Sequence, residues 1–132
     1  MRVHDLPVLR LLLFAPLAVV AEPTGAEETP ELIRQGRTVA ERHCVRCHVI
    51  DDDNRFSGIS STPSFPLLVR ALADWEARFL SFHTRLPHPS IVRFKDEPVD
   101  KSRGQPTVPV EIDFGDIAAI VAYVRTLADN DR

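Results

Sequence analysis

The run His43-Cys44-Val45-Arg46-Cys47-His48 holds both cysteines and two of the five histidines of this 132-residue chain. Cys44, Cys47 and His48 form a Cys-x-x-Cys-His pattern, which is the attachment signature of a c-type haem. Positions i, i+3 and i+4 of a helix share one face, so the two sulfurs and the imidazole can point at one object. Each thiol can form a thioether with a porphyrin vinyl group while the imidazole ligates the iron. The run therefore predicts one covalently bound haem c.

Three other uses of the two cysteines compete with haem attachment. A thioredoxin-like dithiol normally lies within a βαβ pattern, and no strand alternation flanks this run. A sulfur-rich zinc site usually needs four protein ligands, whereas Cys44 and Cys47 are the only cysteines. A disulfide between them would close too small a loop to stabilise the fold much. We therefore place a redox dithiol second and a zinc site third.

The composition is that of a single small globular domain. Hydrophobic residues make up 44% of the chain and charged residues 27%, which excludes a disordered or fibrous protein. The net charge is −3, whereas nucleic-acid binding relies on a basic surface. We therefore expect no nucleic-acid partner.

Residues 1–21 have the features of a secretory signal peptide. Arg2 and Arg10 make the start positive, residues 11–20 are apolar, and small residues up to Ala21 offer a cleavage site. The apolar run of about ten residues is too short to span a bilayer, which takes about 20. We expect cleavage after Ala21, export, and no membrane association afterwards. An uncleaved membrane anchor is the alternative.

The remaining sequence divides into a short spacer and one domain. Residues 22–30 are polar and contain Pro and Gly, as in a flexible segment. Residues 31–132 form the expected domain. A domain of this size has a marginal core of its own, so a large buried cofactor would supply much of the missing apolar contact.

Helical periodicity marks both ends of this domain. The first helix is expected from about Pro30 to Cys47 with Thr29 as its N-cap, and the last from Phe114 to about Ala128 with Asp113 as its N-cap. Gly36 lies inside the first helix, where Gly costs about 1 kcal/mol relative to Ala. Its presence predicts that another backbone approaches closely there.

The middle of the chain gives weaker signals. Apolar residues spaced three and four apart predict two short helices over residues 65–86, the second capped by Asp74. Residues 49–64 are expected to form a loop whose acidic triplet, residues 51–53, is solvated surface. Residues 87–109 contain five prolines and are expected to form a long extended loop, of a length that is commonly functional.

These features resemble a class I-type monohaem cytochrome c of the bacterial, exported kind. The resemblance rests on the haem motif, on Gly36 eight residues before the first Cys, on Thr62-Pro63-Ser64-Phe65, and on the closing residues 116–124. It implies an all-α fold in which the N- and C-terminal helices cross, while short helices and a long loop surround one haem.

The resemblance also implies roles for single residues. His48 would be the proximal iron ligand, and a proline carbonyl would accept a hydrogen bond from its other ring nitrogen. Pro63 is the first candidate for that carbonyl and Pro66 the second. Such a bond would hold the imidazole in one tautomer and tune the ligand.

The chain departs from the family pattern at the distal ligand. Such cytochromes usually supply a Met before the last helix, whereas the only Met here is Met1. The segment His88-Pro89-Ser90-Ile91-Val92 stands where relatives often read His-Pro-x-Met-Pro, and the alkyl chain of Ile91 cannot ligate iron. Either His88 or His83 fills the sixth position, giving a lower potential than Met/His ligation, or the position is open to a diatomic gas. We expect His88, which two prolines flank.

Haem propionates carry negative charge and attract arginine side chains. Arg46, Arg55 and Arg93 are the candidates for this role, with solvated surface as the alternative for each.

Taken together, these residues predict a periplasmic electron-transfer protein rather than an enzyme. Its haem iron would cycle between Fe(III) and Fe(II), and its partners would be redox proteins. The alternative is a gas-binding or sensing haem protein with an open or weakly ligated sixth position.

Overall fold

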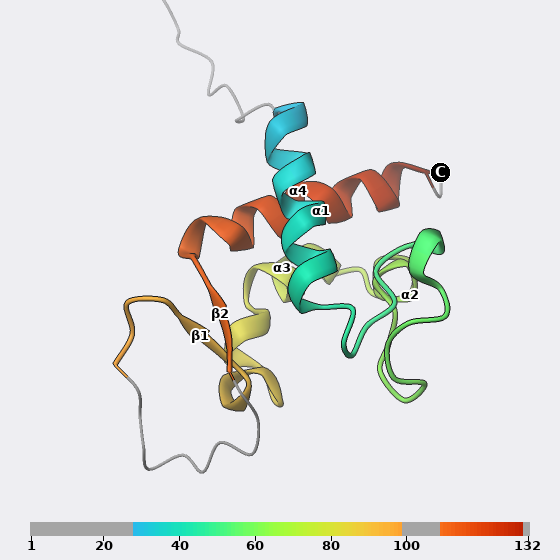
Figure 1. Cartoon of the computed structure of the whole chain (residues 1–132). Helices are drawn as coiled ribbons and strands as arrows, with labels where there is room; N and C mark the ends of the chain where they lie inside the picture. Colours follow the sequence, from blue (N-terminus) through green and yellow to red (C-terminus); the bar gives the residue numbers. More distant parts are fainter. Residues whose placement is uncertain (1–27, 99–108, 131–132) are drawn as a thin grey trace, which may run out of the picture.

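A computed structural model of the chain describes residues 28–98 and 109–130. The expected signal peptide and most of the expected spacer lie outside these residues. The structure is mostly helical, as predicted (Figure 1). In chain order its elements are α1 (Pro30–His43), η1 (Asp52–Asn54), α2 (Phe65–Ala71), α3 (Trp75–Leu80), η2 (Phe82–Thr84), η3 (His88–Ser90), β1 (Val92–Phe94), β2 (Val110–Ile112) and α4 (Phe114–Asn130).

Helices α1 and α4 cross in direct backbone contact, as Figure 1 shows. A Cβ atom built on Gly36 would lie 1.8 Å from the carbonyl oxygen of Ala119 and 2.4 Å from its carbonyl carbon. No side chain can occupy that space, so glycine is required at the crossing. The predicted close approach of another backbone is confirmed, and the backbone that approaches is that of α4.

Helix α1 begins where predicted and ends earlier than predicted. The hydroxyl of Thr29 accepts a hydrogen bond from the Leu32 N–H at 3.2 Å, which satisfies one of the free donors of the first turn. The helix ends at His43 with Cys44 as its C-cap, so the prediction of a helix up to Cys47 was wrong. The haem motif continues as a tight turn, in which the N–H groups of Cys47 and His48 both donate to the Cys44 carbonyl.

The main core lies between α1, α2, α3 and α4. Its buried members are Ala40, Ile50, Phe65, Phe79, Ile120, Val121, Tyr123 and Val124. Both short middle helices were predicted. Asp74 occupies the N-cap position of α3 as predicted, but its carboxylate accepts from Arg78 at 2.8 Å and not from a backbone N–H of the described first turn.

One member of the acidic triplet is buried, contrary to the expectation of a solvated surface. Asp51 is 8% exposed and accepts a hydrogen bond from the Tyr123 hydroxyl at 2.6 Å. Its other oxygen accepts from the N–H groups of Asp53 and Asn54, which caps η1. The guanidinium group of Arg37, in α1, lies 3.4 Å from the Asp51 oxygen that Tyr123 contacts. Asp51 therefore links α1, η1 and α4.

The segment expected to be an extended loop, residues 87–109, contains η3 and strand β1, and β1 pairs in parallel with β2, which directly follows the segment. Val92 pairs with Val110 and Phe94 with Ile112. A second core cluster of Val110, Ile112 and Ile117 lies beside the sheet, with Ile91, Val92 and Phe94 packed against it. The sheet therefore joins the segment that follows His88 to the start of α4.

An arginine of α4 also ties the residue before α1 to α3 and α4. Arg125, near the end of α4, forms ion pairs with Glu28, just before α1, and with Glu76 of α3. Among the described residues, no helix combines the length and the apolar character needed to cross a membrane.

The crossing at Gly36 gives a first test. Gly36→Ala should lower the free energy of unfolding by about 3 kcal/mol, because the methyl group would force α1 and α4 apart. Gly115→Ala, in α4, is the matched control, since in the described part of the chain no atom other than those of its neighbours and its own helix backbone lies within 4 Å of its Cβ position. It should change the free energy by less than about 1 kcal/mol. Denaturant unfolding of the haem-loaded protein measures both, and equal effects would refute the crossing argument.

The Tyr123–Asp51 contact gives a second test. Burial, and then the hydrogen bond to Asp51, raise the pKa of Tyr123 above its usual value. The folded protein thus keeps the phenol neutral while the unfolded chain ionises it above about pH 10. Its contribution to stability is present below that pH and is lost as the pH rises further.

Tyr123→Phe should therefore lower the free energy of unfolding by about 2 kcal/mol at pH 7. The variant should also show a shallower loss of stability than the wild type between pH 9 and about 11. Denaturant unfolding of both proteins across this range measures the difference. Parallel pH curves would show that Tyr123 is not the titrating group.

Candidate haem site

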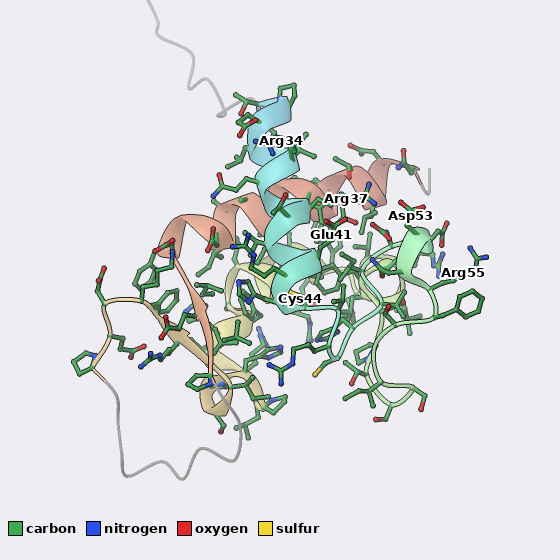
Figure 2. The ribbon with its side chains drawn as sticks, viewed as in Figure 1. Arg34, Arg37, Glu41, Cys44, Asp53 and Arg55 are labelled. Atoms are coloured by element: carbon green, nitrogen blue, oxygen red, sulfur yellow. The ribbon has the colours of Figure 1, made fainter. Side chains whose placement is uncertain are left out.

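The two cysteines lie where α1 ends. Cys44 stands at the end of this helix in Figure 2 and packs against the main core. Burial, and then the nearby Cys47, raise the pKa of its thiol to about 12. Dithiol oxidoreductases instead lower the pKa of the attacking thiol, because the thiolate is the nucleophile. The environment of Cys44 thus disfavours the redox-dithiol alternative.

His48 is held by the loop that follows it. Its Nδ1 lies 2.7 Å from the carbonyl oxygen of Pro63. A carbonyl only accepts, so Nδ1 carries the proton and donates it, and Nε2 keeps its lone pair for a metal. The Phe65 ring lies 5.5 Å from the imidazole at 52° and covers part of it. The Pro63 carbonyl thus leaves Nε2 of His48 as the nitrogen available to a metal, while Phe65 packs against the ring.

Gly58 positions the haem motif, a role that its place in the sequence did not indicate. Its φ is +81°, a backbone conformation that glycine adopts readily. A Cβ atom there would lie 2.9 Å from the His48 carbonyl carbon and 3.0 Å from the Cys47 oxygen. The next residue, Ile59, donates its N–H to that Cys47 oxygen at 3.0 Å. In the sequence, Gly58 indicated only an irregular loop.

His88 lies close to His48, although 40 positions separate them in the sequence. The two ring centroids are 6.1 Å apart and the rings are parallel within 6°. Nδ1 of His88 lies 3.1 Å from the Arg85 carbonyl, so it also donates to a backbone carbonyl and keeps Nε2 for another partner. Burial is the main cause that lowers the pKa of His88, which favours its neutral, metal-binding form.

The separation of the two imidazoles fits a shared metal ion. Bonds of about 2 Å from one metal to two opposite imidazoles place the ring centres about 6 Å apart. The observed 6.1 Å agrees with that value. Among the described residues, no hydrogen bond to either Nε2 competes with such a metal.

The other ligand candidates lie elsewhere. His83 packs against the rings of Phe82 and Phe94, and its buried Nδ1 has no hydrogen-bond partner among residues 28–98 and 109–130. Ile91, at the position of the usual Met, packs into the second core cluster. The structure therefore brings His88, and not His83, to His48.

Of the three arginine candidates for propionate binding, Arg55 lies apart from the other two. Arg55 lies over the ring of Phe56, which is 91% exposed, and points to solvent beyond Asp53 in Figure 2. Arg46 and Arg93 line a common hollow beside the haem motif.

Comparison with known proteins gives one result. A sequence model of the cytochrome c family matches residues 33–128, most of the chain. No curated protein and no solved structure matches this chain. The match includes the Cys-x-x-Cys-His run and extends from α1 to α4, and the cysteine spacing implies a covalently attached haem c. With this match and this arrangement of helices and cysteines, the chain belongs to the cytochrome c family.

Proposed function

We propose that this protein transfers electrons through one haem c that Cys44 and Cys47 hold as thioethers, with His48 as the proximal iron ligand. Membership of the cytochrome c family implies haem c electron transfer in general. The assignment of His48 rests chiefly on its hydrogen bond to Pro63, which leaves Nε2 as the only nitrogen that can bind iron. Pro63 is then the residue that orients the proximal ligand.

We further propose that His88 is the sixth ligand. The parallel rings of His48 and His88, 6.1 Å apart, support this assignment, as does the engagement of both Nδ1 atoms by backbone carbonyls. The chain offers no Met beyond Met1. Two imidazole ligands would give a lower reduction potential than a Met and a His.

The protein contributes rigidity and exclusion of water. When bound, the haem supplies a one-electron iron couple. Pro63 and Arg85 each hold one imidazole through a backbone carbonyl, so neither ligand needs to move when the iron changes charge. Phe65 packs edge to face on Phe79 at 4.9 Å, and Phe82 lies 5.3 Å from His88. These aromatic side chains keep water away from the two ligands.

The sixth ligand is tested by optical spectra of the haem-loaded protein in both redox states. The wild type should be low-spin, whereas His88→Ala should become high-spin and bind carbon monoxide rapidly in the reduced state. His83→Ala is the matched control and should stay low-spin, because His83 packs on Phe94 instead.

Three outcomes would change the proposal. A high-spin wild type that binds carbon monoxide would favour the gas-binding alternative. A high-spin His83→Ala would move the ligand to His83. Absence of haem absorbance after maturation with the attachment machinery would refute haem binding itself.

We also propose that the protein is exported to the periplasm with residues 1–21 removed. The basic start, the short apolar run and the small residues before Glu22 support this. The intact mass of the protein purified from the periplasm should correspond to a chain starting at Glu22 plus one haem. A mass that includes Met1 to Ala21 would instead support an uncleaved anchor.

A further inference from the structure

We propose that the ion pair between Arg93 and Glu111 positions the distal ligand, by holding β1 against β2 in the observed register. This inference rests on the proposed function, because it takes His88 as the sixth ligand of the iron. His88 begins η3, a turn of three residues, and only Ile91 separates this turn from β1. So short a turn cannot hold a metal ligand by itself. The place of His88 therefore depends on what anchors the chain on each side of it.

A short series of backbone hydrogen bonds connects His88 to β2. The N–H of Ile91 donates to the His88 carbonyl at 2.8 Å, and the Ile91 carbonyl accepts from the N–H of Val110 at 2.7 Å. At the other end of the strand pair, the N–H of Lys95 donates to the Ile112 carbonyl at 3.2 Å. Figure 1 shows β2 leading directly into α4. The position of His88 relative to α4 therefore depends on which residues of β1 and β2 face one another.

Charged side chains specify this register. On the core face, both strands present apolar side chains at every second position, so a slip of two residues would keep apolar contact there. Between these positions, Arg93 lies opposite Glu111 and forms an ion pair with it. Two residues further along the chain, Lys95 forms an ion pair with Asp113. A slip of two residues in either direction would leave one of the two cations without a carboxylate opposite it, so the charges favour the observed register.

The two ion pairs differ in their exposure to solvent. The side chain of Arg93 is 25% exposed and that of Glu111 is 44% exposed, whereas those of Lys95 and Asp113 are both more than half exposed. Partly buried charges are screened less by water and salt than exposed ones, and exposed pairs contribute little. We therefore assign the main positioning role to Arg93 and Glu111.

The sheet anchors the chain on the side of His88 that other contacts leave unheld. The Arg85 carbonyl lies 3.1 Å from Nδ1 of His88, and the Phe82 ring lies 5.3 Å from the imidazole. Both contacts orient the imidazole, and both come from residues that precede it. If β1 separated from β2, His88 would be held from one side only, and the bond between iron and imidazole should break more often.

Carbon monoxide binding to the reduced, haem-loaded protein tests this role. The gas can bind only when His88 has left the iron, so at saturating gas the binding rate equals the rate of His88 dissociation. Arg93→Glu places two carboxylates opposite each other and should raise this limiting rate at least about tenfold. The exchange of both charges, Arg93→Glu/Glu111→Arg, restores an ion pair and should return the rate to within about threefold of the wild type.

Two further variants separate positioning from other roles. Glu111→Gln keeps Arg93 and removes its partner, so it should raise the limiting rate if the pair holds the sheet. It should leave the rate unchanged if Arg93 only binds a haem propionate. Tyr123→Phe is the control for general destabilisation, because Tyr123 belongs to the main core cluster and not to the one beside the sheet. It should lower overall stability and leave the limiting rate unchanged, since the sheet can open without global unfolding.

Several results would overturn the positioning role. These are a limiting rate that neither Arg93→Glu nor Glu111→Gln raises, a rise that the charge exchange does not reverse, and equal acceleration by Tyr123→Phe. If Arg93→Glu takes up no haem, Glu111→Gln alone decides. The spectrum of the wild type separates this inference from the proposed function. A high-spin wild type would refute His88 as the ligand, and this inference with it, whereas a low-spin wild type with unresponsive variants would refute the positioning role alone.

Discussion

The crossing of α1 and α4 at Gly36 is the constraint on which the rest of the structure depends. The Ala119 carbonyl occupies the space that a side chain at position 36 would need. The two helices can therefore change their crossing angle and separation very little. The same helix ends one residue before Cys44, and the haem motif follows as a tight turn. The contact between Gly36 and Ala119, two helical turns before Cys44, therefore determines where the cysteines lie.

Local sequence signals predicted much of this fold. The terminal helices have regular apolar spacing and capping residues, and the haem motif is a contiguous run, so neighbouring residues suffice to identify them. The burial of Asp51 could not be predicted, because its partner Tyr123 is 72 positions away. The end of α1 at His43 was also missed, since nothing in the haem motif itself stops a helix.

The parallel pair β1 and β2 escaped prediction for a similar reason. Each strand has only three residues, and the pairing joins positions 18 apart in the sequence. No alternating pattern can be recognised over so short a span. The contact between His48 and His88 likewise depends on how two loops meet. The sequence named His88 as a candidate through its place beside the missing Met, but only the three-dimensional arrangement distinguishes it from His83.

The ion pair between Arg125 and Glu28 has a consequence for how such a module can be combined with others. It holds the residue before α1 against the side of α4, five residues before that helix ends at Asn130. Cys44 is at the far end of α1, about 20 Å along the helix. A polypeptide that packs at the start of α1 would therefore leave the surface near the cysteines uncovered.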